Sequence, residues 1–231
     1  MKGTTMKKAH AITCLFVDIG GVLLTNGWDH QERKRAAAYF KLDWNAMEER
    51  HRLAFDAYEQ GKIQLEEYLR RVVFHEKRPF TQAQFQRFMY AQSSPYRDMI
   101  DLVSRIKALH RLKVAVVSNE GRELNAHRIK RFKLDKFVDF FVSSCYVGLR
   151  KPDPAIFRLA LDLTQVPARQ VVYLENTPMF VQTAEDLGIP SILHVDYEST
   201  RGKLSSFGLH DGEGARSTKP LRQVRLPGAA T

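Results

Sequence analysis

The chain has 231 residues, 44% of them hydrophobic and 27% charged, and carries a formal charge of +10. This composition is typical of a globular domain with an insertion. The mean hydropathy of −0.36 and the lack of any apolar run near the ~18 residues of a membrane helix exclude an integral membrane protein. The polar start, Met1 to His10, is not typical of a signal peptide. Two cysteines, Cys14 and Cys145, cannot form a disulfide framework or a zinc site, so we expect a cytoplasmic protein.

Short apolar runs alternate with helical patterns along most of the chain. The first run, Ile12–Val17, stops at Asp18 and is typical of a strand buried on both faces. Similar runs are Val114–Val117, Phe137–Val142, Val171–Leu174 and Ser191–Val195. The helical patterns between them are Tyr96–His110, Arg122–Phe132, Pro154–Leu163 and Pro178–Leu187. This alternation predicts an α/β fold with a doubly wound, Rossmann-like parallel sheet.

The connection between the first two strands is unusually long. It spans about 90 residues and carries helical patterns at Asp29–Phe40, Asn45–Gln60, Gln64–His75 and Thr81–Ala91. Ligands of such sheets bind at the carboxyl ends of the strands, so a helical subdomain inserted there is placed as a lid. We predict a core of residues 1–24 and 94–210, a helical cap of residues 25–93 and a disordered basic tail of residues 211–231.

Four short motifs lie at or just beyond the carboxyl ends of predicted strands. They are Asp18-Ile19-Gly20-Gly21, Val117-Ser118-Asn119, Arg150-Lys151-Pro152 and Leu174-Glu175-Asn176. A carboxylate fixed at the end of a buried strand is a nucleophile able to form an aspartyl-phosphate, and Asp18 has this position. Phosphoryl transfer also needs the phosphate oxygens held and neutralised. Ser118 and the following backbone N–H groups supply neutral donors, and Lys151 supplies a cation.

Each motif alone also has an ordinary structural interpretation. Asp18 could cap the next turn, and Ser118-Asn119 could be a plain turn, since both residue types bond to local backbone. Lys151 could be a solvated loop lysine. Glu175 could be favoured simply by the dipole of a following helix.

The order of the four motifs, with a helical insertion after the first strand, resembles the haloacid dehalogenase-like superfamily over residues 11 to about 209. The resemblance implies Asp18, Ser118 and Lys151 as catalytic residues. It implies Mg²⁺ as the cofactor, and the implied metal ligands are Asp18, Gly20 through its carbonyl oxygen, Glu175 and Asn176. The implied phosphate-binding residues are Gly20, Gly21 and Asn119.

Two positions depart from the family pattern. Phosphatases of the family usually carry an Asp where this chain has Gly20, and that Asp acts as the acid and base, a contribution of about 10²–10⁴-fold. The metal motif is usually a pair of acids, and here its second member is Asn176. We therefore expect weaker magnesium binding, and an activity that is low or depends on the leaving group. The dehalogenase branch favours Asn and Asp where this chain has Thr177 and Phe180.

The sequence thus predicts a Mg²⁺-dependent phosphatase of a small phosphorylated metabolite, such as a sugar phosphate. The alternatives are a catalytically weakened binding or regulatory module and, less favoured, a 2-haloacid dehalogenase. The small metabolite is the expected partner, no membrane is expected, and an exposed cap face leaves room for a homodimer.

Three further features bear on specificity and partners. Trp28 and His30, at the hinge into the cap, are candidates to face a substrate, although His30 also suits a surface position. The turn Gln60-Gly61-Lys62 is a specificity loop or a plain glycine helix stop. Residues 105–136 hold ten Lys or Arg against three acidic residues. We predict that this basic segment lies opposite the active site as a solvated face, and nucleic acid binding is not favoured because no known motif accompanies it.

Overall fold

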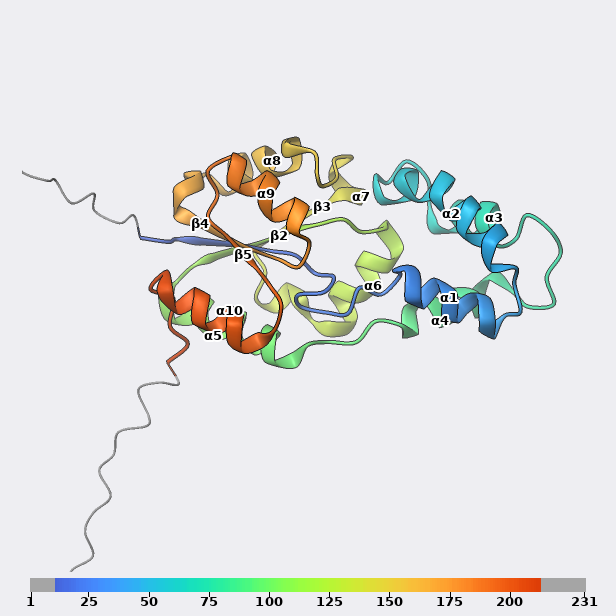
Figure 1. Cartoon of the computed structure of the whole chain (residues 1–231), viewed down its shortest axis with the longest axis horizontal. Coiled ribbons are helices and arrows are strands. Elements are labelled where there is room, and N and C mark those ends of the chain that lie inside the picture. Colours follow the sequence, from blue (N-terminus) through green and yellow to red (C-terminus); the bar gives the residue numbers. More distant parts are fainter. Residues whose placement is uncertain (1–10, 213–231) are drawn as a thin grey trace, which may run out of the picture.

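The computed structural model describes residues 11–212 (Figure 1). In this part of the chain, parallel strands form one five-stranded sheet in the order β3-β2-β1-β4-β5. The strands are β1 (Cys14–Val17), β2 (Lys113–Ser118), β3 (Phe140–Ser143), β4 (Val171–Glu175) and β5 (Ser191–Leu193). The predicted doubly wound parallel sheet is confirmed.

Helices cover both faces of the sheet (Figure 1). Leu15 and Val17 of β1 pack toward α5 (Arg97–His110) and α10 (Tyr197–Ser206). Cys14 and Phe16 pack toward α8 (Pro154–Thr164) and α9 (Pro178–Asp186). Successive side chains of a strand point to opposite faces, and this explains why β1 is apolar at every position.

The strand register gathers the motifs at one edge of the sheet. Val17 pairs with Val116 of β2 and with Leu174 of β4. The next residues, Asp18 and Glu175, therefore stand level with each other where their strands end. Ser118 ends the neighbouring strand β2.

The insertion after β1 forms a helical cap at this carboxyl edge, seen on the right of Figure 1. It contains α1 (His30–Tyr39), α2 (Trp44–Glu59), α3 (Leu65–Val72) and α4 (Gln82–Ala91). Its helices bury a core of their own, rich in aromatic rings. Trp28 donates through Nε1 to the Tyr68 hydroxyl (2.9 Å), which lies 2.8 Å from Nδ1 of His51. Burial lowers the pKa of His51 to about 3, so this imidazole is neutral and accepts the Tyr68 proton.

Some predicted elements differ from the observed ones. The third strand begins at Phe140 rather than Phe137, because Phe137 and Val138 fill the core after a 3-10 turn (Leu134–Lys136) instead of pairing with β2. Four elements were not predicted: the 3-10 turns Leu134–Lys136 and Ala168–Gln170, α7 (Ser144–Val147) and α10. No helix of residues 11–212 combines the length and apolar character needed to cross a membrane.

The predicted tail begins within the folded core. Asp211 is buried, and its carboxylate accepts from Nε of Arg201 at 2.7 Å. The remaining tail residues, 213–231, lie outside the described residues.

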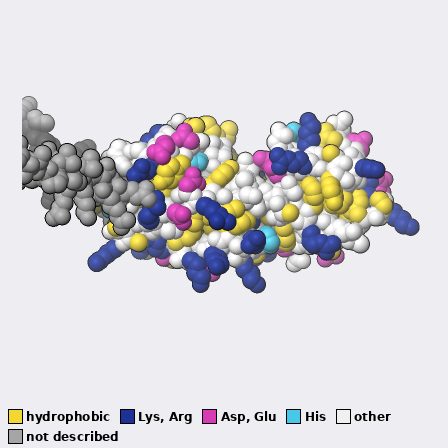
Figure 2. All heavy atoms as spheres, turned by 90° about the horizontal axis from the view of Figure 1, so that it is seen from below, with side chains coloured by type: hydrophobic (Ala, Val, Ile, Leu, Met, Phe, Trp, Pro, Cys, Tyr) yellow, Lys and Arg dark blue, Asp and Glu magenta, His cyan; other side chains and the backbone are white. Residues whose placement is uncertain are grey.

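The basic segment is less uniform than its sequence indicates. Arg128 of α6 (Arg122–Phe132) is 1% exposed and lines the cavity described below, so its predicted place opposite the active site is wrong. Lys107 pairs with Asp139 at 2.6 Å, and Lys113 donates to the carbonyl of Thr164 at 2.7 Å. Figure 2 shows basic, acidic and apolar side chains interspersed on the core face that it presents.

The cap contacts the core through α2. Tyr58, completely buried, packs against Gly121 in the loop after β2, and a Cβ atom at position 121 would overlap its ring. Arg150, just before Lys151, pairs with Asp56 and, at 2.6 Å, with Glu59. Gly121 and Arg150 thus join the cap to the two loops that carry Ser118 and Lys151.

Replacing Gly121 with Ala should displace Tyr58 and loosen the cap, because overpacking a filled contact destabilises it by about 1–3 kcal/mol. We expect faster hydrogen–deuterium exchange in α2 and an unchanged rate in β1 and β4. Gly202→Ala is the matched control, since a Cβ there meets open space and Ala favours a helix. Exchange in α2 equal to that of the control would show that Tyr58 is not needed to hold the cap.

Candidate active site

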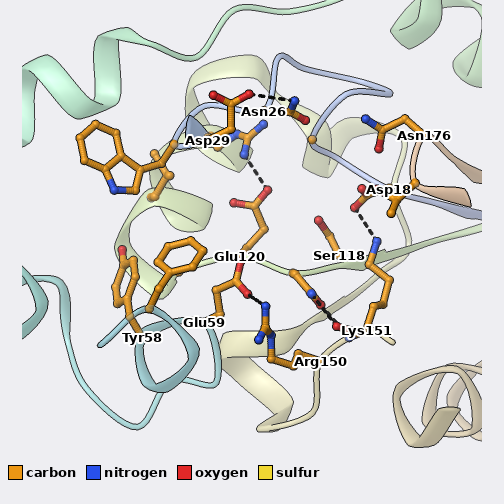
Figure 3. A pocket seen from close by; sticks show the side chains of 18 of the residues that line it. Asp18, Asn26, Asp29, Tyr58, Glu59, Ser118, Glu120, Arg150, Lys151 and Asn176 are labelled. Carbon is orange, nitrogen blue, oxygen red and sulfur yellow. Dashed lines mark hydrogen bonds and ion pairs between the residues drawn. The ribbon is translucent and has the colours of Figure 1, made fainter. Parts of the chain in front are cut away.

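A cavity of about 350 Å³ opens between the carboxyl edge of the sheet and the cap (Figure 3). The core and the cap both line it. The lining residues used below are Asp18, Gly20, Asn26, Trp28, Asp29, His30, Arg33, Phe55, Tyr58, Glu59, Ser118, Asn119, Glu120, Arg128, Arg150, Lys151, Asn176 and Phe180.

Lys151 lies at the centre of the polar network, with 1% of its surface exposed. Its Nζ lies 3.1 Å from Oδ1 of Asp18 and 2.6 Å from Oε2 of Glu175. It also donates to the Tyr173 hydroxyl at 3.0 Å, and that hydroxyl donates in turn to Glu175. The structure therefore brings together the predicted nucleophile, the predicted cation and the first acid of the fourth motif.

Burial and neighbouring charges set the protonation of this network. Burial, with help from Glu175, raises the pKa of Asp18 to about 6, while Lys151 and the Ser118 hydroxyl act in the opposite direction. Burial also disfavours the charged form of Lys151, but Asp18 and Glu175 outweigh it and the pKa of Lys151 is raised. At neutral pH the pair is thus a carboxylate beside an ammonium.

Two predicted phosphate contacts have structural roles. The Asn119 side chain donates to the carbonyl of Lys151 at 2.9 Å and accepts from its N–H at 2.8 Å, so this amide holds the Lys151 loop. Gly21 does not line the cavity. It has a φ of +76°, and a Cβ there would overlap the Asn176 amide, which explains glycine at this position.

The four predicted metal ligands do not have equal access to the cavity. Glu175 is fully buried, with Oε2 held by Lys151 and Oε1 accepting from the N–H groups of Asn176 and Thr177 at 2.9 Å each. Glu175 thus positions Lys151. The orientation of the Asn176 amide that satisfies its hydrogen bonds directs Nδ2 at the Gly20 carbonyl (3.3 Å) and at Glu175 Oε1 (2.9 Å).

The remaining oxygens fit a weakly held magnesium ion. Asp18 Oδ1 is buried with the Lys151 ammonium 3.1 Å away as its ion-pair partner, and Gly20 lines the same cavity. Rotating the Asn176 amide would present its oxygen as a third ligand. Mg²⁺ prefers oxygen ligands, but among residues 11–212 no cluster of three His, Cys, Asp or Glu could hold a metal. One carboxylate and two neutral oxygens predict low affinity.

The charges around the cavity also favour an added cation. Four basic side chains, Arg33, Arg128, Arg150 and Lys151, line it beside four carboxylates, Asp18, Asp29, Glu59 and Glu120. The arginines pair with Glu48, Glu120 and Glu59. A phosphate dianion would therefore enter a site whose cations are already neutralised.

Sequence reasoning missed most of the cap side of the cavity. Phe55, Tyr58 and Glu59 of α2 line it, whereas the Gln60–Lys62 turn does not. The turn instead packs on α7, where a Cβ at Gly61 would overlap the Cys145 carbonyl. Trp28 and His30 both line the cavity, and the His30 side chain is 54% exposed.

Comparison with known proteins agrees with this architecture. The family model for haloacid dehalogenase-like hydrolases matches residues 12–188. The chain belongs to the haloacid dehalogenase-like hydrolase family. The HAD family enzyme bt-2542 of Bacteroides thetaiotaomicron, in complex with magnesium and inorganic phosphate, superposes with a TM-score of 0.69 at 18% identity, covering 82% of this chain and 99% of that one. At this identity the likeness shows the fold.

Curated relatives match in shorter stretches. The phosphorylated carbohydrates phosphatase of Thermotoga maritima is 28% identical over 142 residues, 62% of this HAD-like chain and 61% of the relative. Bifunctional epoxide hydrolase 2 of Sus scrofa is 36% identical over 93 residues, 38% of this chain and 17% of the relative. The matched part thus spans less than two thirds of either relative's length.

Restoring the missing ligand charge with Asn176→Asp should tighten Mg²⁺ binding at least about tenfold, or about 1.4 kcal/mol, because a carboxylate replaces an amide beside Gly20. Isothermal titration of the folded protein with MgCl₂ measures this. Asn45→Asp, which adds the same charge at an exposed position of α2, should leave the affinity unchanged. Equal affinities of both variants and the unmodified chain would remove Asn176 from the metal site.

Proposed function

We propose that this HAD-like hydrolase is a Mg²⁺-dependent phosphatase that acts on a small phosphorylated metabolite through an aspartyl-phosphate. The observation that carries the proposal is the buried pair of Asp18 and Lys151, which lie 3.1 Å apart and line the cavity between the sheet and the cap. The relative from Thermotoga maritima, whose name is phosphorylated carbohydrates phosphatase, supports the same substrate class.

In this proposal Asp18 attacks the phosphorus atom. Its carboxylate is ionised at neutral pH, since its pKa is raised only to about 6. Lys151 and Ser118 bind the equatorial phosphate oxygens, over which negative charge is spread during transfer. Glu175 and Asn119 hold Lys151 in place through its Nζ and its backbone.

When bound, Mg²⁺ neutralises the charge of the transferred phosphoryl group. Asp18, the carbonyl of Gly20 and the oxygen of Asn176 would hold it. The buried rings of Tyr58 and Trp28 line the cavity and give it an apolar wall beside the polar residues of the sheet edge.

The cavity gives less support to 2-haloacid dehalogenase chemistry. Phe180 stands at the position where the dehalogenase branch favours an Asp, and its ring lies 4.9 Å from Nζ of Lys151. An apolar ring cannot activate the water that must release an ester intermediate. A binding module is the second candidate, favoured by the absence of a side chain at Gly20 and by the amide at Asn176.

Phosphate release from a panel of sugar phosphates, acyl phosphates and nucleotides, with and without Mg²⁺, tests the proposal. We expect metal-dependent turnover that Asp18→Asn abolishes, since an amide cannot serve as the nucleophile. Asp162→Asn, a change on the surface of α8, should retain full activity. Activity retained in Asp18→Asn would contradict the proposal, and silence across the panel with folded protein would favour the binding module.

A further inference from the structure

Gly20 leaves the site without an acid at the position where family phosphatases carry one. A Cβ at Gly20 would face the Asn26 side chain at 3.4 Å. Asn26 donates to Asp29 at 3.1 Å, so an amide occupies this side of the cavity. A proton for the leaving oxygen must come from another residue or not at all.

Besides Asp18, three carboxylates line the cavity, and one of them, Asp29, is committed to the N-terminus of a helix. Asp29 caps α1, with Oδ1 accepting from the N–H groups of Gln31 and Glu32, and these and other hydrogen bonds hold its pKa below the ordinary value although burial opposes them. Glu59 belongs to the cap and pairs with Arg150 at 2.6 Å. Its position therefore depends on cap closure.

Glu120 is held by the core alone. Its N–H donates to the Ser144 hydroxyl at 2.9 Å, and Oε1 accepts from Nη1 of Arg128 at 2.7 Å. Arg128 also donates to the Thr25 carbonyl at 2.6 Å. Figure 3 shows the Glu120 carboxylate extending into the middle of the cavity, between the hinge residue Asp29 and the cap residue Glu59.

We propose that Glu120 is the general acid and base of this site, in place of the side chain absent at Gly20. The inference rests on the proposed phosphatase function. In-line attack by Asp18 places the leaving oxygen on the far side of the phosphorus, toward the cavity. Ser118, the proposed phosphate-binding residue at the end of β2, is two residues before Glu120, and both residues line the cavity that the leaving group would enter.

The two steps balance in atoms and protons. As an Asp18 oxygen bonds to phosphorus, the bond from phosphorus to the ester oxygen breaks and the Glu120 carboxyl proton moves to that oxygen, releasing an alcohol. A water molecule then attacks the phosphorus atom and gives a proton to the Glu120 carboxylate. The bond between phosphorus and Asp18 breaks, which yields inorganic phosphate and restores both residues.

Burial acts on the pKa of Glu120 in the direction that favours the protonated form. It raises the pKa of this carboxyl group, as does the charge of Asp18, whereas Arg128 and Lys151 act in the opposite direction.

Comparison of two leaving groups tests Glu120. Glycerol phosphate releases an alkoxide that needs a proton, whereas acetyl phosphate releases acetate that does not. Glu120→Gln keeps an acceptor for Arg128 but transfers no proton. We expect its kcat/KM to fall by about 100-fold or more for glycerol phosphate and by less than about tenfold for acetyl phosphate, with partial recovery in Glu120→Asp.

The controls separate catalysis from structure. Glu49→Gln, at an exposed cap position, should leave kcat/KM unchanged for both substrates. If Glu120 has only a structural role, Glu120→Gln will lower kcat/KM equally for both substrates, and that result overturns the proposal. A leaving-group-dependent loss in Glu59→Gln instead would assign the role to Glu59. If Glu120→Gln fails to fold, the test is the dependence of kcat/KM on leaving-group basicity in the unmodified enzyme. A steep fall of kcat/KM with increasing basicity means that no acid protonates the leaving group, and it overturns the proposal. Absence of Asp18-dependent turnover of either substrate would refute the phosphatase function itself.

Discussion

The buried ammonium of Lys151 is the constraint on which the site depends. Removing a charge from water is expensive unless partners replace the lost hydration, and here Asp18, Glu175 and the Tyr173 hydroxyl supply them. These partners stand on the adjacent strands β1 and β4, whose parallel register brings Asp18 and Glu175 level. The sheet therefore fixes the positions of the Asp18 and Glu175 carboxylates, and these two groups determine where the loop can place the Lys151 ammonium.

The cap and the catalytic loops share their ion pairs. Arg150 pairs with α2, and the next residue along the chain is Lys151. Arg128 joins Glu120 to the Thr25 carbonyl at the cap hinge. The position of the cap and the positions of the loops that line the cavity are therefore linked by these ion pairs.

Local patterns made the strands and the four motifs predictable, because buried parallel strands are continuously apolar and each ends at a polar residue. The roles of Glu120 and Arg128 were not predictable, since their pairing depends on the approach of a loop and a helix to the hinge. Arg128 lies among basic residues in sequence, yet the helical period places it on the inner face with Leu124 and Asn125. Helix α10 was missed because it buries Thr200 beside Leu204 and has little apolar period.

The departures from the family pattern at Gly20 and Asn176 leave the buried charged cluster intact, although burying charges costs free energy. Asp18, Lys151 and Glu175 remain buried together, although well-packed apolar side chains could replace such a cluster without loss of stability. Both hydrogen bonds of the Asn119 side chain go to the backbone of Lys151 and hold its loop. A chain that bound its partners elsewhere on the surface would gain nothing from this arrangement. This is why we propose that the protein acts at this cavity, and why the source of the proton for the leaving group is the main chemical question in that proposal.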